Sequence, residues 1–115
     1  MDNYSEDIIQ KVWNKGVYIG HNDPNMWRKD ECGAWMGRHF YGNHESTYGW
    51  EIARLPDEVD IKDDPVAGLI PLQWQNQKES TEGKLVCKVT ASAKHKFKNV
   101  EGHLIDGYEI PDKDN

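Results

Sequence analysis

Near the N-terminus, hydrophobic residues recur at the three- and four-residue spacing that places side chains on one face of a helix: Ile8, Ile9, Val12 and Trp13. Ser5 stands just before this segment, and its hydroxyl can accept a hydrogen bond from a free backbone N–H of the first turn. The pattern therefore predicts a helix from Glu6 to about Asn14.

Two segments in the middle of the chain are rich in residues that favour strands. Residues 34–41 and 48–55 each read as extended, and the polar residues 42–47 between them suit a connecting turn. We expect these two segments to pair as a β-hairpin. Before them, residues 22–24 are turn-forming and are followed by a single predicted helical turn through Trp27 and Asp30.

After the hairpin, the pattern predicts one more helix and one more strand. Pro71 suits the first turn of a helix that runs to about Glu79, because an N–H is not needed there. Residues 84–91 are rich in β-forming side chains and predict a strand, whereas the last dozen residues show no clear period. The predicted fold class is α+β: a small single domain with an N-terminal helix, a β-hairpin plus helix, and an extra C-terminal strand.

Composition limits the chain to one domain with one hydrophobic core. It has 115 residues, of which 37% are hydrophobic, and five tryptophans and five tyrosines supply large buriable surfaces. No apolar run approaches the roughly 20 residues of a membrane span, and the acidic N-terminus is not a secretory signal. We therefore expect a cytoplasmic protein in which Cys32 and Cys87 are buried thiols, although two cysteines could form one disulfide.

Charge is segregated along the chain, within a formal net charge of −6. One acidic segment carries the carboxylates of Asp57, Glu58, Asp60, Asp63 and Asp64. Residues 101–115 form a second acidic segment. We expect this segment to be a C-terminal tail that follows a domain formed by residues 1–100. Four lysines lie within eleven residues: Lys88, Lys94, Lys96 and Lys98. The acidic segments suit either solvated loops or a surface that imitates phosphates, and the lysines are candidate nucleic-acid contacts.

Three motifs carry a resemblance to a known family. They are WRKDECGAW at residues 27–35, YGWEI at residues 48–52 and PLQWQN at residues 71–76. In this order they resemble a family of small bacterial and phage HNH endonuclease-like proteins, over residues 12–100. The resemblance implies a core of a β-hairpin and a helix around one divalent metal, in which a histidine at a strand end activates water.

The chain departs from this family at the positions that carry the chemistry. YGWEI typically continues with Asp-His in the family but continues here as Ala53 and Arg54, and an Asn-Leu step becomes Gly68-Leu69. Ala53 has no lone pair for a metal, and Arg54 stays protonated below a pH of about 12. Asn76, where the family helix supplies a late ligand, otherwise reads as part of a polar helix face. We expect Arg54 to pair with Glu51 or with a loop aspartate.

These departures predict a protein that binds rather than cleaves, with no catalytic residues, no metal and no cofactor. The preferred function is that of a phage or mobile-element inhibitor of a host nucleic-acid-targeting defence system (anti-CRISPR or anti-restriction type) in a bacterial cytoplasm. The expected binding residues are 57–64 and Arg54, with the acidic tail as a second phosphate-imitating surface. One alternative is a metal-dependent HNH endonuclease with relocated groups such as His39 or His44, with weak support for a zinc site. Another is a non-cleaving nucleic-acid-binding module. A protein partner and no membrane are expected, and the oligomeric state stays open.

Overall fold

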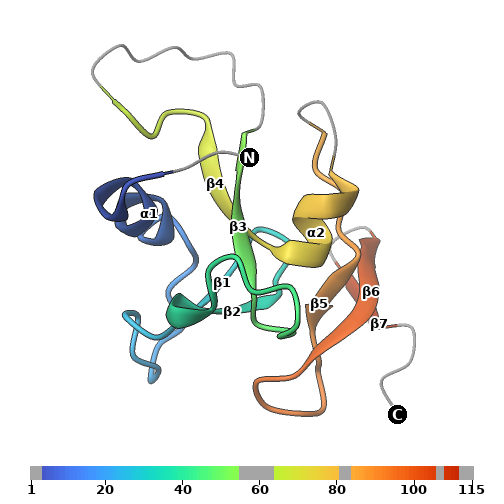
Figure 1. Ribbon diagram of the computed structural model, residues 1–115. Coiled ribbons are helices and arrows are strands. Elements are labelled where there is room, and N and C mark those ends of the chain that lie inside the picture. The colour runs from blue at the N-terminus through green and yellow to red at the C-terminus, as the bar shows by residue number, and fades with distance from the viewer. Residues whose placement is uncertain (1–3, 55–63, 81–83, 106–107, 112–115) are drawn as a thin grey trace.

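The computed structural model describes residues 4–54, 64–80, 84–105 and 108–111, and only the backbone after residue 101. Within these residues there are two α-helices, α1 (Glu6–Trp13) and α2 (Trp74–Glu79), and a short 3-10 helix, η1 (Arg38–Phe40). The strands are β1 (Trp27–Lys29), β2 (Trp35–Gly37), β3 (Trp50–Arg54), β4 (Leu69–Gln73), β5 (Val89–Ala91), β6 (Asn99–Ile105) and β7 (Tyr108–Pro111). The fold class is therefore α+β, as predicted (Figure 1).

The strands form three small antiparallel sheets. In the first, β1 pairs with β2, and in the second, β3 pairs with β4, from Trp50 opposite Gln73 to Arg54 opposite Leu69. The third sheet has the order β5-β6-β7. In Figure 1, α1 lies on one side of the β3–β4 pair, and α2 with the third sheet lies on the other side.

The N-terminal helix is confirmed, together with its cap. The hydroxyl of Ser5 accepts a hydrogen bond from the Ile8 N–H at 3.2 Å. Ile9, Val12 and Trp13 form the buried face of α1. The Trp13 ring lies 5.2 Å from the ring of Trp50 on β3, so the helix and the β3–β4 pair share the main hydrophobic core.

The predicted hairpin is wrong, because its two strands have other partners. β2 ends at Gly37, directly before η1, and it pairs with β1 rather than with β3. The turn between β1 and β2 is short, so closing it costs less chain entropy than closing a longer loop to β3. Residues 27–29 are therefore a strand, and the predicted helical turn through Trp27 and Asp30 is also wrong.

The second predicted helix begins three residues later than expected. Pro71 lies in β4, opposite Ile52, and β4 is an edge strand, where proline is tolerated. The side-chain oxygen of Gln73 accepts hydrogen bonds from the N–H groups of Gln75 and Asn76. Gln73 thus provides the N-cap of α2, and the helix begins at Trp74.

The C-terminal part of the chain contains more strand than predicted. The strand expected at residues 84–91 is reduced to β5, and β6 and β7 extend the sheet into the last dozen residues. β6 also runs across residue 100, where the sequence suggested the boundary between the domain and the acidic tail. The division of the chain at that residue stays a prediction.

Candidate functional site

Ala53 and Arg54, which the resemblance compares with the Asp-His pair of HNH proteins, lie at the end of β3. Ala53 is 7% exposed and lies opposite Ile70, and Arg54 is exposed and lies opposite Leu69. The carboxylate of Glu51, one expected partner of Arg54, instead contacts the His44 ring, with Nε2 2.6 Å from Oε2. The expected pairing of Arg54 with Glu51 is therefore not found. Aspartates 57, 60 and 63 lie outside the described residues.

Gly68 and Asn76 occupy structural positions. Gly68 has φ of +77° directly before β4, a conformation that favours glycine. Asn76 is fully buried, so its interpretation as part of a polar helix face is wrong. Its amide nitrogen donates to Asp30 and to the Val89 carbonyl, and its amide oxygen accepts from the N–H groups of Lys88 and Val89. These four bonds occupy the amide, so it has no free oxygen to offer a metal.

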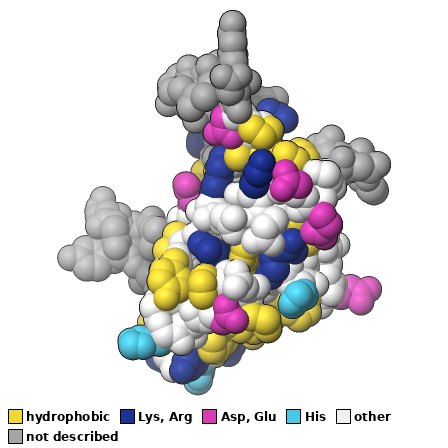
Figure 2. All heavy atoms as spheres, turned by 90° about the vertical axis from the view of Figure 1, so that its left-hand side faces the viewer, with side chains coloured by type: hydrophobic (Ala, Val, Ile, Leu, Met, Phe, Trp, Pro, Cys, Tyr) yellow, Lys and Arg dark blue, Asp and Glu magenta, His cyan; other side chains and the backbone are white. Residues whose placement is uncertain are grey.

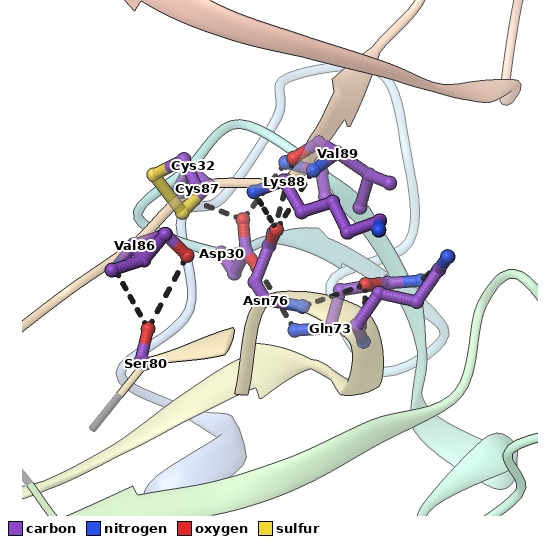
Figure 3. The surroundings of a disulfide bond; sticks show 11 residues. Asp30, Cys32, Gln73, Asn76, Ser80, Val86, Cys87, Lys88 and Val89 are labelled. Atoms are coloured by element: carbon purple, nitrogen blue, oxygen red, sulfur yellow. Dashed lines mark hydrogen bonds between the residues drawn. A yellow bond between two sulfur atoms is a disulfide. The ribbon is translucent and has the colours of Figure 1, made fainter. Parts of the chain in front are cut away.

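Asp30 was not identified from the sequence as a site residue, although it lies at the centre of this network (Figure 3). It is 2% exposed. One carboxylate oxygen accepts from the N–H groups of Cys32 and Ala34, and the other accepts from the Gln73 N–H and the Asn76 amide, all at 2.8–3.0 Å. Burial raises the pKa of Asp30, and these four hydrogen bonds oppose that rise.

Cys32 and Cys87 form a disulfide, so their prediction as buried thiols is wrong (Figure 3). The network around Asp30 explains the pairing. Asp30 holds the N–H of Cys32, and Asn76 holds the N–H of Lys88, the residue after Cys87. The two Cα atoms are consequently 5.4 Å apart, within the range of a disulfide. The thiol prediction depended on a cytoplasmic location, which itself stays a prediction.

Among the carboxylates of the acidic segment at residues 57–64, only that of Asp64 lies within the described residues, and Asp64 is half-buried. Its carboxylate accepts a hydrogen bond from the Val66 N–H at 3.0 Å, as aspartates at turns often do. Asp57, Glu58, Asp60 and Asp63 are not described. On the α1 side of the molecule, basic, acidic and hydrophobic side chains are interspersed, and the described residues show no large area of one charge in that view (Figure 2).

The structure separates the four lysines that the sequence groups together. Lys94, Lys96 and Lys98 are exposed in the turn between β5 and β6. Lys88 precedes the other end of β5 and lines a small cavity with Lys78 and Trp74 of α2. Lys88 therefore belongs to a different surface from the other three.

The two histidines near the middle of the chain, His39 and His44, are both exposed. His39 lies in η1. The His44 ring stacks on Trp74, with ring centroids 4.9 Å apart, and also contacts Glu51. No group of three or more His, Cys, Asp or Glu side chains that could hold a metal ion occurs among the described residues. Cys32 and Cys87, whose thiolates would be the usual partners of histidine in a zinc site, are joined in the disulfide.

Comparisons with protein-family models, with curated proteins and with solved structures found no match to this chain. Among the residues that the structure describes, neither helix has the length and apolar character needed to cross a membrane.

Proposed function

We propose that this protein acts by binding, on an HNH-like scaffold that has lost its nuclease chemistry. The observation that carries this proposal is the end of β3, where a buried methyl group and a guanidinium lie at the positions for which the resemblance implies an aspartate and a histidine. A methyl group cannot hold a metal, and a guanidinium can neither hold one nor accept a proton near neutral pH.

The order of the elements supports the HNH-like part of the proposal. β3 and β4 form a hairpin, and α2 follows β4 without an intervening loop. Strand, strand and helix in this order are what the resemblance implies for the metal core. The internal bonds of Asn76 support the loss of catalysis, because Asn76 stands where the resemblance implies a late metal ligand and its amide is used within the fold instead.

The partner class that we propose is a protein, specifically an effector of a host defence system that acts on nucleic acid. The acidic segment at residues 57–64 connects β3 to β4, next to the altered position at Arg54. Carboxylates at this density can imitate the phosphates of a nucleic acid and occupy a basic channel of the effector. Inhibition would then result from occlusion of that channel.

One observation favours a second candidate, a nuclease with relocated groups. The contact between His44 and Glu51 is the arrangement of a general base that a carboxylate orients. Trp74 holds the ring from one side. This candidate needs a metal or an electrophilic group near His44, for which the described residues offer no cluster of three ligands.

A nicking assay on supercoiled DNA with magnesium or manganese tests both candidates. We expect the native protein to be inactive and the variant Ala53→Asp with Arg54→His to nick DNA detectably, because the variant restores a ligand and a base. The matched control is Ala53→Asn with Arg54→Gln, which changes the same positions without a base. Nicking by the native protein that is lost in His44→Gln would contradict the proposal and establish the second candidate.

The partner class is tested by removing four of the five negative charges of the acidic segment at residues 57–64. We expect the change of Asp57, Asp60 and Asp63 to Asn and of Glu58 to Gln to abolish inhibition of a purified nucleic-acid-targeting effector. The control changes four exposed glutamates elsewhere to Gln: Glu31, Glu45, Glu79 and Glu101. Because both variants remove four charges, equal inhibition by the two would contradict a specific role of residues 57–64.

A further inference from the structure

The turn between β5 and β6, residues 92–98, is fixed at both ends. At its start, the Ser92 hydroxyl accepts hydrogen bonds from the N–H groups of Lys94 and His95. At its end, the Asn99 side chain bonds both backbone groups of Trp35 and the Thr47 carbonyl. These bonds define the conformation of the turn and attach its end to β2 of the first sheet. In Figure 1 it lies at the opposite end of the molecule from the last residues of β3.

A cluster of aromatic side chains lies beside this turn. The Phe97 ring has its centroid 4.9 Å from that of Trp27 and 4.6 Å from that of Trp35, and Tyr48 contacts Trp27 at 5.1 Å. Trp35 is buried, whereas Trp27, Tyr48 and Phe97 are half-buried and keep part of their surface in contact with solvent. We call Trp27, Tyr48 and Phe97 the aromatic cluster.

Phe97 has an unusual backbone conformation, which the surrounding contacts maintain. Its φ is +60°, a value that is rare for a bulky residue and costs free energy. The Tyr48 hydroxyl donates a 2.6 Å hydrogen bond to the Phe97 carbonyl, and two tryptophans contact the ring. The strained turn thus keeps the half-buried ring of Phe97 against the two tryptophans.

Two lysine amines lie near aromatic rings beside this turn, one over the aromatic cluster and one over the neighbouring Trp35. The amine of Lys96 lies 5.9 Å from the centroid of the Phe97 ring, and the amine of Lys29 lies 4.9 Å from that of Trp35. Lys94, Lys96 and Lys98 are exposed, and none forms an ion pair with a carboxylate of the described residues. These amines are therefore available to neutralise an anionic ligand.

We propose that the aromatic cluster and the lysines of the β5–β6 turn form a binding site for single-stranded nucleic acid. Lysines contact successive phosphates, and unpaired bases stack on the exposed parts of the aromatic rings. A duplex keeps its base faces inside its own stack, so this surface favours single strands over duplexes. The site is independent of the proposed function, because it uses no residue of β3, of the acidic segment or of α2.

The lysine contribution is tested by fluorescence anisotropy with labelled dT12 and the full chain. The triple variant Lys94→Gln, Lys96→Gln, Lys98→Gln is expected to bind at least tenfold more weakly than the native protein. The slope of log affinity against log salt should fall by about 2, because three phosphate contacts are lost at about 0.7 each. The matched control is Lys78→Gln, Lys84→Gln, Lys88→Gln, for which we expect a change of less than twofold. Equal weakening of both variants would overturn the site.

The stacking contribution is tested with the native protein, so that no aromatic residue of the fold is changed. An abasic oligonucleotide of the same length carries the same phosphates without bases, and we expect it to bind at least tenfold more weakly than dT12. A 12-base-pair duplex should also bind more weakly. Abasic or duplex probes that bind as tightly as dT12 would overturn the proposal in favour of a general polyanion surface. A parallel titration with labelled U12 shows whether the site prefers RNA or DNA. If neither dT12 nor U12 binds, the proposed site is wrong.

Discussion

At the scale of the residue, Asp30 has an environment that differs from the usual one for an aspartate. Four N–H groups donate to its carboxylate from three parts of the chain, the β1–β2 turn, the end of β4 and α2. All four donors are neutral. The hydrogen bonds favour the charged form, and burial disfavours it more strongly, so the pKa of Asp30 lies above its ordinary value.

The change Asp30→Asn is expected to lower the free energy of unfolding by about 2 kcal/mol, because an amide presents an N–H where N–H donors already point. Between the unfolded pKa near 3.8 and the higher folded pKa, the folded state binds more protons than the unfolded state. The stability contribution of Asp30 therefore falls as pH rises through this window.

Urea unfolding of the native protein and of Asp30→Asn at several pH values measures both effects. The stability advantage of the native protein should narrow as pH rises above 3.8. The exposed Asp7→Asn serves as a control for general charge effects, because Asp7 lies at the surface in the first turn of α1 and pairs there with Lys11. An advantage that widens with pH would mean that the four hydrogen bonds outweigh burial.

At the scale of the elements, the disulfide joins the β1–β2 turn to the segment that leads into β5. Cys32 and Cys87 are 55 residues apart in the sequence. The Asn76 amide nitrogen donates hydrogen bonds to Asp30 in this turn and to the Val89 carbonyl, and the Ala91 N–H donates to the Gly33 carbonyl, so hydrogen bonds hold the same two segments. Covalent and non-covalent contacts therefore act on one junction between the first and third sheets.

Replacing both cysteines with serine is expected to lower the free energy of unfolding by about 4 kcal/mol, from the chain entropy of a loop of this length. Urea unfolding with and without a reductant measures this loss. The native protein should lose a similar amount on reduction, and the double serine variant should not respond to the reductant. A native protein that is insensitive to full reduction would contradict a stabilising role of the bond.

Sequence patterns predicted the elements whose signals are local. The helix α1 was placed correctly because its apolar spacing and the cap at Ser5 lie within ten residues. The partner of β2 was not predicted correctly. Its pairing with β1 depends on the turn at Asp30, and the carboxylate of Asp30 is held in part by the N–H of Gln73, far away in the sequence. The start of α2 depends on the side chain of Gln73, which caps the helix. Sequence rules for helix starts favour a proline in the first turn over a glutamine cap, so they placed the start at Pro71.

The candidate site was predictable to a similar extent. The positions of Ala53 and Arg54 at a strand end followed from the YGWEI motif, and the structure places both at the end of β3. The buried role of Asn76 and the disulfide were missed because both depend on contacts between segments far apart in the chain. The separation of Lys88 from the other lysines was missed because sequence spacing does not show which end of a strand a residue occupies.

At the scale of the whole molecule, the Cys32–Cys87 bond makes the chain a covalent ring with two arms. The ring contains β2, η1, β3, β4 and α2, whereas α1 and β1 lie on one arm and β5, β6 and β7 on the other. A single break in the backbone between residues 33 and 86 would leave all parts of the protein covalently connected. β3, β4 and α2, which we propose as the remnant of a nuclease, lie inside this ring. Cleavage of one peptide bond in the ring leaves a single covalent molecule, whereas cleavage of one peptide bond in either arm releases a fragment.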